Sequence, residues 1–195
     1  MCIRDSKDKS PINPGQAIEI VKRIKAIEKK KINNLIKKCV EEIINRTDNN
    51  LPFIKDEESQ PGVYQSAWKG LGEDYRDYNC GLGLKHIAKV IKEVVKIKHP
   101  DVKISIKTAR GRTIDMTVLS ADRELLVDPN HPQGYCVSRS TEVLCPKGKE
   151  LVELINNTTA FFNHDRSDGM TDYFDTGFYS SIGIGRYDKP FTVVN

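Results

Sequence analysis

The stretch VKISIKTARGRTIDMTV, residues 102–118, decides the fold of this 195-residue chain. Apolar and polar residues alternate strictly in two runs, on either side of a glycine. Alternation at period two is typical of β-strands that bury one face. The stretch therefore predicts a β-hairpin over about residues 102–118.

The two apolar sets also constrain the register of this hairpin. Residues that oppose each other across an antiparallel pair share a face of the sheet, so Ile106 is expected opposite Ile114. That register leaves a three-residue loop, residues 109–111, in which Gly111 takes the position that needs a positive φ. The arginines on either side of Gly111 then project at the tip of the hairpin.

Helical periodicity surrounds the hairpin. Apolar residues recur every three to four positions over residues 82–98 and again over residues 147–163, which predicts two amphipathic helices. Residues 14–46 carry two weaker apolar stripes, typical of one long helix or a helical hairpin. Short strands are predicted in TGFYSSIGIGR, residues 176–186, and in the last five residues. The expected class is α+β: an antiparallel sheet built on the hairpin, with helices on one face and an N-terminal helical segment before it.

Composition shifts along the chain predict its organisation. Residues 1–6 resemble a translated sequencing-adaptor remnant, so we expect a non-native leader there. A helical segment over 7–50 and a Pro-, Gly- and acid-rich connector over 51–79 precede an α+β domain over 80–195.

Charge is segregated in the same way. Residues 7–46 carry a net charge of +6, residues 47–79 −4, residues 80–113 +7 and residues 114–195 −5, which sum to the chain's +4. Such blocks either pair within the fold or form basic patches that attract an anionic partner.

No apolar run reaches the length of a membrane span, so no membrane partner is expected. The number of cysteines, five, is odd, which fits reduced thiols better than a set of disulfides, so a cytoplasmic protein is expected. The isoleucines of the N-terminal segment leave two arrangements open, a homodimer or burial within one chain.

Motifs of catalysis and metal binding are weak in this sequence. It has no Walker loop, dinucleotide fingerprint, HExxH or CxxC. Neither a zinc site from His131, Cys136, Cys145 and His164 nor a catalytic pair of His164 with Asp165 has a supporting pattern. We therefore expect no catalytic residue, no metal and no cofactor.

Two stretches in order resemble a known family. CGLGLKHIAKVIKEVVKIKHPDVKISIKTARGRTIDMTV, followed by SDGMTDYFDTGF at residues 167–178, is similar to the large polyvalent protein-associated domain of phages and conjugative elements. The resemblance covers roughly residues 78–180, and much of residues 119–146 looks like an insertion. It implies a mobile-element context rather than a particular reaction.

The acidic and aromatic stretch at residues 167–178 has two interpretations. It is either a turn that packs its aromatics on the sheet, or the wall of a pocket beside the basic hairpin. In the second case guanidinium and ammonium groups would bind phosphate while an aromatic ring stacks on a planar group. The expected ligand-binding residues are Lys107, Arg110, Arg112, Asp168, Tyr173 and Tyr179.

The function expected from these observations is non-enzymatic. A phage or mobile-element accessory protein would bind and sequester an anionic small ligand, such as a signalling nucleotide, against host defence. A nucleic-acid- or protein-binding module and a phosphodiester-cleaving enzyme that acts on such a nucleotide are the alternatives.

Overall fold

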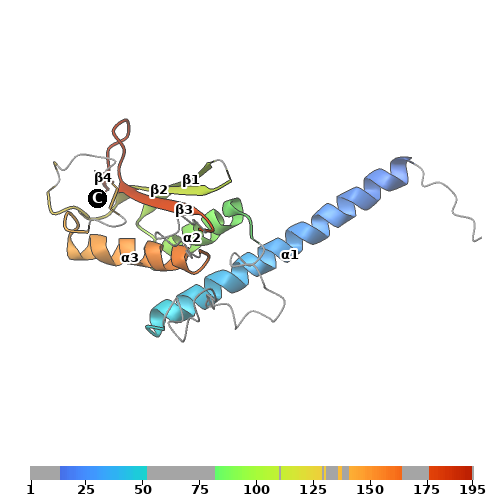
Figure 1. Ribbon diagram of the computed structural model, residues 1–195, viewed down its shortest axis with the longest axis horizontal. Helices are drawn as coiled ribbons and strands as arrows, with labels where there is room; N and C mark the ends of the chain where they lie inside the picture. Colours follow the sequence, from blue (N-terminus) through green and yellow to red (C-terminus); the bar gives the residue numbers. More distant parts are fainter. Residues whose placement is uncertain are drawn as a thin grey trace, which may run out of the picture. The chain divides into compact units, whose positions relative to one another are not determined.

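The computed structural model describes residues 14–51, 82–109, 111–128, 130, 136–137, 141–163 and 176–194. These residues form three helices and a four-stranded sheet (Figure 1). The elements in chain order are α1 (Pro14–Asp48), α2 (Leu84–Lys98), β1 (Lys103–Ala109), β2 (Thr113–Ala121), α3 (Pro146–Ala160), β3 (Tyr179–Ile184) and β4 (Thr192–Val193). The α+β class is confirmed.

The chain divides into two compact units, residues 1–35 and residues 36–195. The predicted N-terminal segment is one continuous helix, α1, rather than a helical hairpin. Its residues up to Leu35 belong to the smaller unit, and those from Ile36 belong to the larger one. Within the larger unit, Ile36, Cys39 and Ile43 are buried.

The hairpin forms as predicted, with its register shifted by two residues. Ile106 lies opposite Met116 rather than Ile114, and Ala109 closes the hairpin opposite Thr113. The loop is therefore residues 110–112 instead of 109–111. A shift of two keeps every side chain on its predicted face, because the side-chain period of a strand is two. Gly111 has φ +67°, as the turn requires.

The sheet is mixed. β1 pairs antiparallel with β2, whereas β3 and β4 both run parallel to β2 on its other edge. An amide side chain joins the last helix to β3: Asn163 Nδ2 donates to Phe178 O at 2.8 Å, and Phe178 N donates to Asn163 Oδ1 at 3.0 Å.

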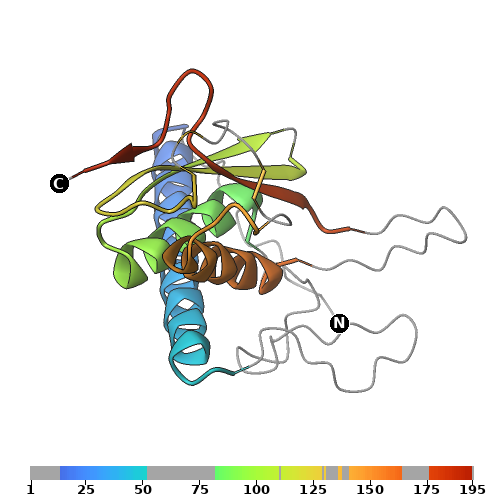
Figure 2. The same cartoon turned by 90° about the vertical axis from the view of Figure 1, so that its left-hand side faces the viewer.

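The core lies between the helices and one face of the sheet. Figures 1 and 2 both show α2 and α3 on the same side of the sheet. Buried side chains alternate along the strands, as at Ile114, Met116 and Val118, and recur with helical spacing on α2, as at Ile87, Ile91 and Val94. Alternate strand residues consequently point to the opposite face. Within the described part of the chain, no helix is both long enough and apolar enough to cross a membrane.

Candidate functional site

The sheet face opposite α2 and α3 is lined by polar residues. We call it the polar sheet face; it consists of Ser105, Lys107, Thr113, Asp115, Thr117, Tyr179 and Ser181, with Arg186 lying across it. The cross-strand pairs place these residues in rows, because partners across a ladder share a face. Lys107 lies opposite Asp115, which lies opposite Ser181, and Thr113 lies opposite Tyr179.

Arg186 is the residue that organises this face. The chain leaves β3 through Gly185, whose φ is +65°, and the segment that follows rises on the side of the sheet away from the helices (Figures 1 and 2). Arg186 then donates from Nε to Thr117 Oγ1 at 3.2 Å and from Nη2 to Ser105 Oγ at 3.1 Å. Both acceptors are neutral hydroxyls, so these bonds orient the guanidinium without neutralising its charge.

Arg186 was not among the residues expected from sequence. The stretch GIGRYDKP contains two glycines, but no helical pattern follows it, so it lacks the pattern of a phosphate-binding loop. The available signal was weaker: a glycine directly after a period-two run marks a sharp change of chain direction, which lets the next side chain fold back onto the sheet.

The structure brings three of the six predicted ligand-binding residues to the hairpin end of the sheet. Lys107 and Tyr179 lie on the polar sheet face, and Tyr179 N donates to Arg112 O at 2.8 Å. The side chain of Tyr179 is 55% exposed, and Lys107 and Arg112 are also exposed. Arg110, Asp168 and Tyr173 lie outside the described residues, as does most of the stretch 167–178.

The cations of this site, Lys107, Arg112 and Arg186, outnumber the carboxylate of the polar sheet face, Asp115. Among the residues that the structure describes, the side chains of Lys107, Arg112 and Arg186 form no ion pair. The carboxylate of the polar sheet face, Asp115, accepts a hydrogen bond from Ser181 Oγ at 2.8 Å. Guanidinium and ammonium groups in excess of the nearby carboxylates are well suited to bind an anion.

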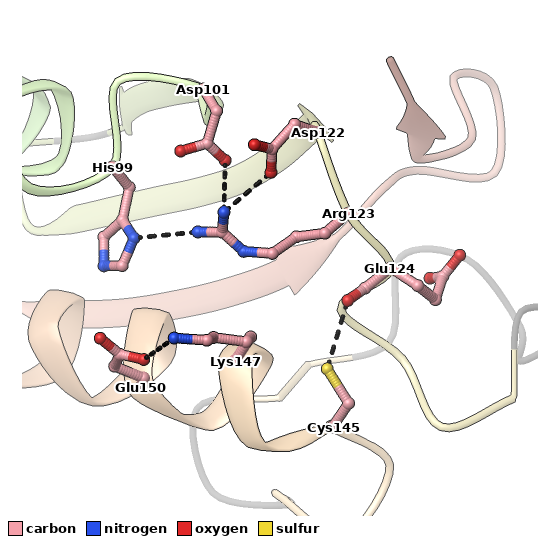
Figure 3. Close-up of polar contacts among 8 residues, drawn as sticks. All are labelled: His99, Asp101, Asp122, Arg123, Glu124, Cys145, Lys147 and Glu150. Carbon is pink, nitrogen blue, oxygen red and sulfur yellow. Dashed lines mark hydrogen bonds and ion pairs between the residues drawn. The ribbon is translucent and has the colours of Figure 1, made fainter. Parts of the chain in front are cut away.

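A second polar cluster surrounds His99 at the end of α2 (Figure 3). Arg123 Nη2 lies 3.2 Å from His99 Nδ1, and Arg123 Nη1 forms ion pairs with Asp122 at 2.8 Å and Asp101 at 3.2 Å. Because arginine only donates, His99 Nδ1 is the acceptor and the ring proton sits on Nε2. Figure 3 shows Nε2 pointing toward α3, where Glu150 lies.

Burial lowers the pKa of this histidine. His99 is 8% exposed, and desolvation is the largest cause that lowers its pKa. The nearby Arg123 and Lys147 lower the pKa further, while Glu150 and Asp101 oppose them.

His99 also lines a cleft of about 670 Å³ that is bordered by the end of α1, the end of α2 and α3. Most charged groups of the cleft are already paired: Lys98 with Asp48, Arg46 with Glu42, and Glu150 with Lys147. The cleft therefore offers an ionic ligand less than the polar sheet face does.

The residues considered for zinc do not assemble in the described part of the chain. No group of three or more His, Cys, Asp or Glu side chains there could hold a metal ion. The thiol of Cys145 instead donates to Glu124 O at 3.2 Å (Figure 3), and Cys136 is exposed beside β3. His131, His164 and Asp165 lie outside the described residues.

Comparison with known proteins gives no relative. No protein-family model, no curated protein and no solved structure matches this chain.

Proposed function

We propose that this protein binds a phosphate-bearing anionic ligand, of the nucleotide class, on the polar sheet face. The observation that carries the proposal is Arg186, which two neutral hydroxyls hold over the sheet and which forms no ion pair with any residue that the structure describes. Ordering a long arginine side chain costs conformational entropy, and a binding site gains from having that cost met before the ligand arrives.

The layout of the face suits a nucleotide. Ser105, which holds Arg186, and Lys107 are two residues apart on the same side of β1, so their Cα atoms are about 7 Å apart. Both cations can therefore contact one phosphate group or two adjacent ones. Tyr179 lies two strands across and two residues along from Lys107, so their Cα atoms are about 12 Å apart, and its exposed ring is free to stack on a base.

Binding without cleavage is the activity we propose for this site. Its groups are cations, hydroxyls and a single carboxylate that already accepts a bond from Ser181. They stabilise a bound phosphate but include no activated nucleophile of the usual kinds. Sequestration of a signalling nucleotide by a mobile-element protein is consistent with this chemistry, and that biological context is a proposal that rests on the family resemblance alone.

The test is calorimetry against cyclic and linear nucleotides, with variants of the two cations. Charge-assisted hydrogen bonds contribute about 1.5–3 kcal/mol each, so Arg186→Gln and Lys107→Ala should each weaken binding by roughly tenfold to a hundredfold. Arg186→Lys should weaken it less, because charge is kept while the fork of donors is lost. Lys92→Ala, an exposed lysine on α2, is the matched control and should bind as wild type does.

Two results would contradict the proposal. One is wild-type affinity in folded Arg186→Gln and Lys107→Ala proteins. The other is the appearance of new products when the bound ligand is recovered and chromatographed, which would favour the phosphodiester-cleaving alternative. Tight binding of single-stranded oligonucleotides of any sequence, falling steeply with salt, would instead assign the face to nucleic acid.

A further inference from the structure

The first half of α1 presents large apolar side chains to solvent. Within the smaller unit, Ile18, Ile20, Val21, Ile24 and Ile27 are between 46% and 58% exposed. Isolated exposed apolar residues are common, but four of these five, Ile20, Val21, Ile24 and Ile27, lie within about 120° of one another around the helix and form a continuous apolar strip.

Most of this surface follows a heptad repeat. When Ala17 is numbered a, the a and d positions hold Ala17, Ile20, Ile24, Ile27, Lys31 and Asn34. The buried residues of α1 in the larger unit do not continue the series, since Ile36, Cys39, Val40 and Ile43 fall at f, b, c and f. Ile20, Ile24 and Ile27 lie at a and d, as in a coiled-coil seam, Val21 at e borders the seam, and Ile18 at b lies outside it.

We infer that residues 17–34 pair in parallel with the same segment of a second copy of this chain, as a short two-stranded coiled coil. Isoleucine at both a and d favours higher oligomers, and Lys31 opposes this preference, because a polar residue at a single a position specifies register and oligomeric state at a cost in stability. The seam ends before Ile36, where the larger unit begins.

The charges that flank the seam select the second copy and its orientation. Arg23 is at g and Glu28 is at the following e position, so a parallel pair places Arg23 of each chain beside Glu28 of the other. In an antiparallel pair, g faces g, and Arg23 and Lys30 would repel their counterparts. In the single helix Arg23 pairs with exposed Glu19 at 3.2 Å, a weak contact that an interhelical pair can replace.

The remaining lysines distinguish pairing with a second copy of the chain from binding to an anionic surface. Lys22, Lys25 and Lys29 fall at f, b and f, which point away from a partner helix. Salt screens the repulsion between two such basic helices, so added salt should preserve or strengthen the association. Binding of the same helix to nucleic acid or anionic lipid would weaken with salt instead.

The first experiment is sedimentation equilibrium of the full-length chain over a range of concentrations, with two matched variants. Ile24→Glu places a charge in the seam and should abolish the dimer. Ile18→Glu makes the same substitution at a comparably exposed isoleucine in position b, and should leave it intact. Thermal melting of both proteins checks that the larger unit stays folded.

The second experiment tests register and orientation. Lys31→Ile should tighten the dimer by at least about tenfold, because an apolar side chain replaces a charged one in the seam. Arg23→Glu should weaken it, and Arg23→Glu with Glu28→Arg should restore it. The inference is overturned if the wild type is monomeric at every concentration, if Ile18→Glu is as damaging as Ile24→Glu, or if the double exchange does not rescue.

Discussion

At the scale of single residues, His99 shows how one hydrogen bond and burial together determine a protonation state. Arg123 can only donate, so it requires an unprotonated Nδ1, and desolvation disfavours the imidazolium. The folded-state pKa therefore lies below the unfolded value of about 6.5.

This shift predicts that stability falls with acidity. Below about pH 6.5 the unfolded chain takes up a proton on His99 that the folded protein resists, so the free energy of unfolding decreases as the pH falls toward the folded-state pKa. At higher pH both states are neutral at this residue and the contribution is constant. Urea denaturation at pH 7.5 and pH 5.5 measures the effect.

The matched variant for this prediction is His99→Gln, whose side-chain oxygen can accept from Arg123 but does not titrate. Its stability should change less between the two pH values than that of the wild type. An identical pH dependence in the two proteins would show that other groups, such as the carboxylates, account for all of the slope.

At the scale of elements, the hairpin combines a correctly predicted positive φ at Gly111 with a register and a loop that sequence could not determine. The apolar alternation predicted both strands and the positive φ of Gly111. It did not distinguish Ile106 opposite Ile114 from Ile106 opposite Met116, because both place apolar side chains on one face. Only the closing pair of Ala109 with Thr113 resolves the difference.

The turn yields a second stability prediction. A Cβ on Gly111 would meet no atom within 4 Å, so the cost of a side chain there is backbone strain alone. Gly111→Val should lose about 1–2 kcal/mol of stability, since a β-branched residue resists positive φ. Gly111→Asn should lose less, because asparagine tolerates this region. Equal melting temperatures for Gly111→Val and the wild type would contradict the strained turn.

At the scale of the whole molecule, Asn163 connects two parts of the larger unit. Its amide pairs with both backbone groups of Phe178, directly before β3, and so ties the end of α3 to the strand that carries Tyr179. An amide with one donor and one acceptor engaged mimics a strand partner for this short stretch of backbone.

Removal of this amide should therefore destabilise the larger unit. Asn163→Ala leaves the N–H and C=O of buried Phe178 without this partner, and a loss of about 1–3 kcal/mol is expected in chemical denaturation. Asn157→Ala, six residues earlier and within α3, serves as the control and should have a smaller effect. A loss in Asn163→Ala no larger than in Asn157→Ala would contradict the role of this amide.

The sequence by itself determined the local structure of this protein. Periods of two and of about 3.6 residues, with glycines and prolines at their ends, located both strands of the hairpin, the later helices and the turn at Gly111, because these features depend on neighbours within a few positions. The same periodicity chose the face on which each strand residue lies, which placed Lys107 and Tyr179 on the polar side.

Only the tertiary structure decided how distant segments meet. It made β3 parallel to β2, so that Tyr179 lies beside Thr113, and it folded Arg186 back over Ser105 and Thr117. Strand direction and cross-strand contacts depend on which separated segments reach each other when the core closes, and an alternating pattern reads the same in either direction. The candidate site is for this reason half predicted by periodicity and half created by the way the sheet is assembled.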